Sequence, residues 1–137
     1  MRESLWYPAL MRTEDVMALT GRLLLAVIFL ASAFGKITNF DATLRYMEAH
    51  AMPLPPLFCA AAIALEALGA VTLVLGYLTR WGAAALIGFL VSVTWIFHIA
   101  PDQRIALLKN LAIMGGLLQV MAFGPGALSL DGTDRPK

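Results

Sequence analysis

The sequence is poor in charge and nearly free of cysteine. Only 14% of its 137 residues are charged, 60% are hydrophobic, and the net charge is +1. This composition excludes an ordinary soluble domain. The low charge also argues against nucleic acid as a partner, because binding there depends on neutralising many phosphates. The single cysteine, Cys59, excludes an internal disulfide and a CxxC redox pair within one chain.

The motifs that usually carry catalysis are also missing. The sequence contains no Gly-rich phosphate loop, no metal-binding motif and no nucleophile with an attendant base. Met47, His50 and Met52 are too few soft ligands to predict a copper site, so no metal is expected. No catalytic residue is assigned. Whether the chain belongs to an enzyme stays open, and at most it is a non-catalytic or quinone-binding subunit of an oxidoreductase complex.

Long apolar runs dominate what is present. Four of them, each 19 to 22 residues long, match the roughly 20 residues that a spanning helix needs. They cover residues 16–35, 57–78, 82–100 and 105–123. The pattern predicts an all-α integral membrane four-helix bundle, with residues 1–137 forming a single domain.

Two details refine this prediction. Phe40, Leu44 and Met47 recur at helical spacing, which predicts a short interfacial amphipathic helix over Phe40–Ala49, between the first two spans. Within the first apolar run, the stretch Leu23–Leu30 is followed by Ala31-Ser32-Ala33, which mimics a signal-peptide cleavage site. Its polar lead-in is long for a signal peptide, so we expect a retained helix.

The distribution of basic residues gives a weak indication of sidedness. Four spans place both termini on one side, and five basic residues lie there against four on the other side. The terminal side has Arg2, Arg12, Arg80, Arg135 and Lys137; the opposite side has Lys36, Arg45, Arg104 and Lys109. Cytoplasmic loops carry an excess of Lys and Arg, so we predict cytoplasmic termini.

Glu66 stands near the middle of the second apolar run, where a carboxylate is costly. Counted from the terminal side, the helical rise places Glu66 about 18 Å deep, Lys109 about 21 Å and Arg22 about 9 Å. We therefore predict that Glu66 faces the bundle centre and pairs with Lys109 first and with Arg22 second.

Other polar residues extend this candidate site. His98 and Asn110 belong to the third and fourth spans, and Lys36 lies at the far end of the first, where it can snorkel to the interface. Carboxylate, ammonium, imidazole and amide groups together can hold a quinone head by hydrogen bonds. Quinone reduction takes up protons, which Glu66 and His98 are suited to exchange. Alternatively, the buried charges only set the register of the helices.

Five stretches of the sequence resemble the DoxX family of small four-helix membrane proteins, in the family's order from about Thr20 to Asp131. They are Phe34–Phe40, Leu65–Gly69 around Glu66, Leu75–Arg80, Lys109–Ala112 with Gly115-Gly116, and the tail Gly124–Asp131. Ala127 departs from the bulky or basic residue common in that family.

This resemblance implies a multi-pass protein of a bacterial or archaeal cytoplasmic membrane. It also implies a membrane subunit or partner of a quinone-linked or thiol- or sulfur-linked oxidoreductase system, because relatives include subunits of a thiosulfate-to-quinone enzyme. Related groups that exchange disulfides use paired cysteines, which this chain lacks. We therefore expect a quinone-like lipophilic molecule to bind near Glu66. The alternatives are a non-enzymatic scaffold or assembly factor, and a small transporter working as a homodimer.

Overall fold

A computed structural model describes residues 12–134, so Arg2, Arg135 and Lys137 lie outside the described residues. Within them the helices are α1 (Thr13–Thr38), α2 (Phe40–Ala49), α3 (Pro55–Leu75), α4 (Thr79–Phe97), the short η2 (Pro101–Gln103), α5 (Arg104–Phe123) and the short η3 (Asp131–Asp134).

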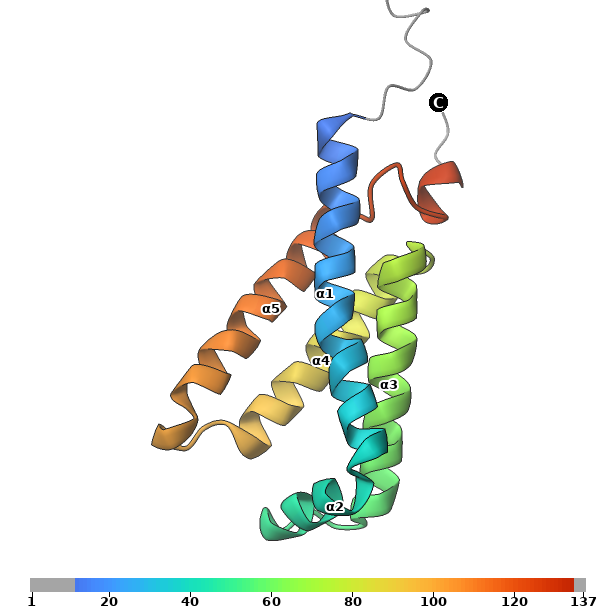
Figure 1. Ribbon diagram of the computed structural model, residues 1–137. Coiled ribbons are helices and arrows are strands. Elements are labelled where there is room, and N and C mark those ends of the chain that lie inside the picture. The colour runs from blue at the N-terminus through green and yellow to red at the C-terminus, as the bar shows by residue number, and fades with distance from the viewer. Residues whose placement is uncertain (1–11, 135–137) are drawn as a thin grey trace, which may run out of the picture.

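Among residues 12–134, four helical segments are long and apolar enough to cross a membrane: Thr13–Thr38, Pro55–Leu75, Thr79–Phe97 and Pro101–Phe123. In Figure 1, α1 and α4 run from the upper end to the lower end, and α3 and α5 return. The amphipathic helix α2 lies crosswise below α1 and α3 (Figure 1) and covers the predicted residues Phe40–Ala49. The predicted fold class, an all-α membrane bundle with a short helix between the first two spans, is confirmed.

Proline and glycine mark the ends of α3. Pro55 and Pro56 occupy its first positions, where the missing N–H group of proline costs nothing. Gly76 ends it with φ +67°, a left-handed conformation that glycine adopts without steric cost. Inside the helix, Gly69 lets α4 approach closely, because a Cβ there would lie 2.6 Å from the Leu86 side chain.

The segment after α5 closes the turn between α3 and α4. The last carbonyl groups of α3 have no partner within the helix, and residues from elsewhere supply the donors. Arg22 donates to the carbonyl of Leu73 at 2.6 Å, while the N–H groups of Leu130 and Asp131 donate to the carbonyls of Leu75 and Gly76. Arg22 also donates to the carbonyl of Leu128, in the tail itself.

Asp131 caps the start of α4 from this tail. Its carboxylate accepts hydrogen bonds from the N–H groups of Leu78 and Thr79 and from the Thr79 hydroxyl. Burial opposes ionisation of Asp131, but these hydrogen bonds and the nearby Arg22 outweigh it and hold its pKa below its usual value. The positive end of the α4 dipole favours the same ionised form.

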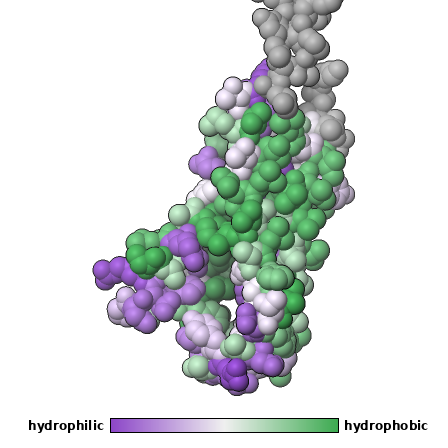
Figure 2. All heavy atoms as spheres, viewed as in Figure 1, coloured by the Kyte–Doolittle hydropathy of each residue, from purple (hydrophilic) through white to green (hydrophobic). Residues whose placement is uncertain are grey.

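The packed core occupies one half of the bundle. Its buried residues come from all four long helices: Ala26, Phe29, Ala70, Leu73, Ala83, Leu86, Leu90 and Leu117. Most of them lie toward the end where the described chain begins and finishes. Toward the other end, α4 and α5 diverge from α1 and α3 (Figure 1). Figure 2 shows an apolar surface over the middle and a hollowed, more hydrophilic lower end.

Candidate functional site

A cavity of about 1010 Å³ fills the half of the bundle that the core leaves open. Residues of α1 to α5 line it, and most are apolar or aromatic, among them Phe29, Phe58, Phe89 and Phe97. Its polar lining includes Ser32, Lys36, Glu66, His98 and Asn110, so every predicted site residue except Arg22 reaches it, Lys109 included. The volume is at the upper end of the range for small-molecule sites.

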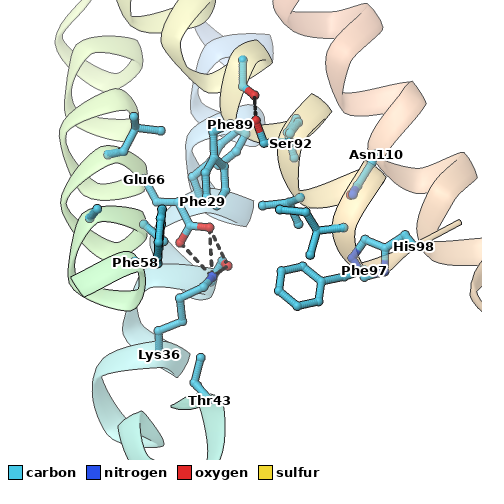
Figure 3. A pocket seen from close by; sticks show the side chains of 18 of the residues that line it. Phe29, Lys36, Thr43, Phe58, Glu66, Phe89, Ser92, Phe97, His98 and Asn110 are labelled. Carbon is cyan, nitrogen blue, oxygen red and sulfur yellow. Dashed lines mark hydrogen bonds and ion pairs between the residues drawn. The ribbon is translucent and has the colours of Figure 1, made fainter. Parts of the chain in front are cut away.

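Glu66 faces the inside of the bundle, as predicted, and only 2% of its side chain is exposed. The ammonium of Lys36 lies 2.9 Å from Oε1 and 3.1 Å from Oε2 of this carboxylate. The Ser32 hydroxyl donates to Oε1 at 3.1 Å. Lys36 Nζ also contacts Ser32 Oγ at 2.7 Å and lies 6.0 Å from the centre of the Phe89 ring. Figure 3 shows the pair at one wall of the cavity.

The predicted partners of Glu66 were wrong. Its ion pair is formed with Lys36, and neither Lys109 nor Arg22 contacts it within the described structure. The reason is the direction of side chains, which tilt toward the N-terminus of their helix. Because α1 and α3 are antiparallel neighbours, Lys36 reaches back along α1 while Glu66 reaches down α3, and the two side chains converge. The ammonium of Lys36, which was also expected to be able to snorkel, lies instead against Ser32 and Glu66.

Lys109 does not pair with Glu66 because their helices are not neighbours. It lies at a suitable depth, but α5 packs mainly on α4 and α4 on α3, so α5 is not a neighbour of α3. Lys109 is exposed and lines the cavity. Arg22 is 1% exposed and points to the end of α3 that lies away from Glu66. It therefore serves the turn between α3 and α4.

The opposite wall carries His98 and Asn110 (Figure 3). Nδ1 of His98 lies 3.2 Å from Oε1 of Gln103, within hydrogen-bond distance. Asn110 is buried and donates from Nδ2 to the Thr94 hydroxyl at 3.0 Å, which joins α5 to α4. The structure thus places the acid and its lysine on one wall and the imidazole and amide on the other.

Aromatic rings close the cavity toward α2. Tyr46 stacks on Phe97 with ring centres 5.2 Å apart, and His50 meets Phe97 edge to face at 4.9 Å. Tyr46 and Phe97 both line the cavity, so these rings connect α2 to the end of α4. The His50 ring is held in this contact, with Nδ1 at 2.9 Å from the Tyr46 carbonyl oxygen.

Sequence reasoning missed two residues of this site, Ser32 and Thr94, and one of the turn between α3 and α4, Asp131. Ser32 precedes Lys36 by four residues, so both lie on one helix face, and that spacing was a readable signal. Thr94 and Asp131 act through contacts with distant segments, for which the sequence has no local signal. Cys59, by contrast, is fully buried in α3, as befits a small apolar side chain.

Comparison with known proteins identifies the family of this chain. The DoxX family profile matches residues 17–99, more than half of the chain. The chain belongs to the DoxX family. Two relatives come from Escherichia coli strain K12. The inner membrane protein YqjF is 36% identical over 123 residues, which are 88% of this chain and 93% of YqjF. The inner membrane protein YphA is 33% identical over 127 residues, 86% of this chain and 90% of YphA. No solved structure matches.

Membership of the DoxX family confirms the resemblance noted from the sequence. Both relatives are named as inner membrane proteins, and the described part of this chain has four candidate spans. A multi-pass DoxX protein of the inner membrane is the identity that these findings support. The cavity around Glu66 is then surrounded by helices that face lipid.

Proposed function

We propose that this DoxX-family protein binds a quinone-like lipophilic molecule in the cavity beside the Lys36–Glu66 ion pair. The observation that carries the proposal is the cavity itself, about 1010 Å³ of mostly apolar lining with a few converging polar groups. A ring with carbonyl oxygens suits such a site, because aromatic side chains cover its faces and polar groups receive its edge.

The polar groups are suited to both sides of a quinone head. Lys36 donates on one wall, where Glu66 and Ser32 orient its ammonium. On the opposite wall, the imidazole of His98 lines the cavity and can carry a donor proton on its ring nitrogens. Proton uptake that accompanies quinone reduction therefore has an available donor next to the proposed head position.

The electrons for such a reduction would come from a partner. The chain has one cysteine, so it forms no thiol couple of its own. We propose that it acts as the membrane subunit or partner of an oxidoreductase, quinone-linked or acting on thiols or sulfur compounds. The partner delivers electrons to the ligand held by this protein.

Lipid extraction tests the proposal most directly. The protein is purified in mild detergent, extracted with organic solvent and analysed by mass spectrometry for isoprenoid quinones. Binding of a short-chain ubiquinone is measured on the same preparation. We expect quinone to co-purify at a substantial fraction of one molecule per protein molecule, and the added ubiquinone to bind saturably.

A matched pair of glycine variants provides the control. A Cβ atom added at Gly88 or at Gly115 would meet no atom within 4 Å, and both glycines are exposed. Gly88 lines the cavity, whereas Gly115 does not. Gly88→Phe is expected to weaken ubiquinone binding at least roughly tenfold, and Gly115→Phe to leave it unchanged. Equal binding by both variants would place the ligand elsewhere and refute the proposed site.

One observation favours the scaffold alternative. Glu66 and Arg22, the charged residues with the smallest exposure, each have close partners within the bundle. A scaffold needs such pairing but no cavity. Absence of quinone from the extract, together with no binding of the probe, would favour this second function.

A further inference from the structure

A second cavity adjoins the first. It measures about 660 Å³ and runs as a groove between α1 and α5, lined among others by Gly21, Leu24, Gly116 and Phe123. Ile28, Lys109 and Ile113 line both cavities. The groove therefore continues the central cavity along the bundle toward the end that carries the described termini, and Lys109 lies where the two meet.

The charges that line these cavities do not balance. In the central cavity, the charged residues are Lys36, Glu66 and Lys109. Lys36 and Glu66 neutralise each other in their ion pair. The ammonium of Lys109 has no hydrogen bond and no ion pair among residues 12–134. The groove adds only Arg22, whose guanidinium is occupied by backbone carbonyls.

Lys109 is exposed to the two cavities, whose walls within the membrane-spanning bundle are mostly apolar. A neutral ligand there would leave the positive charge of Lys109 without a partner, which is unfavourable at membrane depth. An acidic oxygen beside Lys109 would compensate it with a charge-assisted hydrogen bond. The groove, with its apolar walls, is suited to an unbranched or isoprenoid chain attached to that head.

We infer that, compared with a neutral quinone such as ubiquinone, the protein binds more tightly a quinone-like single-chain acidic amphiphile. Its ionised head lies in the central cavity beside Lys109, and its apolar chain lies in the groove between α1 and α5. This inference rests on the proposed function, because it assigns a charge and a chain position to the molecule bound there. Lys109 thereby selects acidic head groups over neutral ones of the same shape.

A pair of synthetic probes tests the charge. One is a hydroxynaphthoquinone with an alkyl chain, whose acidic hydroxyl is ionised at neutral pH; the other is its methyl ether, which is neutral. Binding is measured by titration calorimetry with protein in nanodiscs of phosphatidylcholine. We expect the anion to bind roughly tenfold or more tightly than the ether, in line with a charge-assisted contact.

Three variants attribute this preference to Lys109. Lys109→Gln is expected to reduce the preference to about one, and Lys109→Arg to retain most of it, because the positive charge is kept. Arg104→Gln removes a basic residue of the same helix that lines neither cavity, and it should change nothing. Retained preference in Lys109→Gln would overturn the inference.

Chain placement has its own matched variants. Gly21 lines the groove and Gly35 of the same helix lines neither cavity, and a Cβ atom added at either position meets no atom within 4 Å. Gly21→Leu should weaken the alkylated probe roughly tenfold while leaving the parent compound without the chain unaffected. Gly35→Leu should alter neither. If Gly21→Leu weakens the binding of the alkylated probe and of its parent compound equally, the alkyl chain does not lie in the groove and this part of the inference is wrong.

The remaining outcomes separate this inference from the proposed function. If neither the hydroxynaphthoquinone nor its methyl ether binds the wild-type protein, the proposed function fails and the inference with it. If the two compounds bind equally well, the proposed function stands and the inference is wrong. Nanodiscs containing phosphatidylglycerol identify the source of the acidic group. Complete displacement of the anionic probe there would show that a bilayer phospholipid occupies the site, which also contradicts a single-chain ligand.

Discussion

Removing Lys36 from its ion pair with Glu66 is expected to destabilise the protein more than removing Glu66. Lys36→Met leaves the Glu66 carboxylate, 2% exposed, with only the Ser32 hydroxyl as a partner. Insertion scales and broken buried ion pairs both give a cost of about 3 kcal/mol for an unpaired charge of this kind. We therefore expect Lys36→Met to lower the free energy of unfolding by about 3 kcal/mol.

Glu66→Leu should cost less. Lys36 lies two residues from the end of α1 and its side chain is 20% exposed. Once released, its ammonium can turn to the interface, so we expect a loss of at most about 1 kcal/mol. The double variant replaces a buried pair by apolar side chains and should fall within about 1 kcal/mol of the wild type. The coupling energy between the two positions is then about 3 kcal/mol.

Reversible unfolding in mixed micelles, followed by circular dichroism, measures all four proteins of this cycle. Arg45→Met is a suitable control, because Arg45 is exposed on α2, and it should change the free energy of unfolding by no more than about 0.5 kcal/mol. A Glu66→Leu loss equal to or larger than the Lys36→Met loss would refute the reasoning. So would a coupling energy near zero.

Three further predictions concern the cap formed by Asp131, two glycines with opposite surroundings, and the sidedness of the protein. Asp131→Asn should weaken the cap of α4 by about 1 kcal/mol near neutral pH. Because folding lowers the pKa of Asp131 below its ordinary value of 3.8, its contribution is present above that value and is lost as pH falls through the lower folded value; Asp131→Asn should thus remove part of the acid destabilisation seen in pH-dependent unfolding. Gly76→Ala should cost more than about 2 kcal/mol, since its positive φ and its contacts with Arg22 and Ser129 exclude a methyl group, whereas Gly35→Ala in open helix should stabilise by about 1 kcal/mol in the same unfolding assay. Fluorescent-protein and phosphatase fusions should report cytoplasmic termini, as the distribution of basic residues predicts, and a phosphatase active at the C-terminus would contradict this.

The all-α membrane fold could be predicted from local properties of the sequence alone. Apolar runs of about 20 residues leave few alternatives to spanning helices, because backbone groups in hydrocarbon must be paired within the segment. The spacing of Phe40, Leu44 and Met47 likewise predicted α2 with its observed bounds. Glu66 was recognisable as an inward-facing residue because an acid in such a run has no favourable place toward lipid.

The tertiary structure alone decided which groups meet. Depth along the chain suggested Lys109 as the partner of Glu66, but the choice depends on which helices are neighbours and on the direction in which their side chains tilt. The same is true of Arg22, whose partners are carbonyl groups 51 and 106 residues away. Composition and periodicity describe each helix separately. The cavity, and the contacts of the segment after α5 with the turn between α3 and α4, depend on the angles between helices. No single segment of the sequence determines these angles.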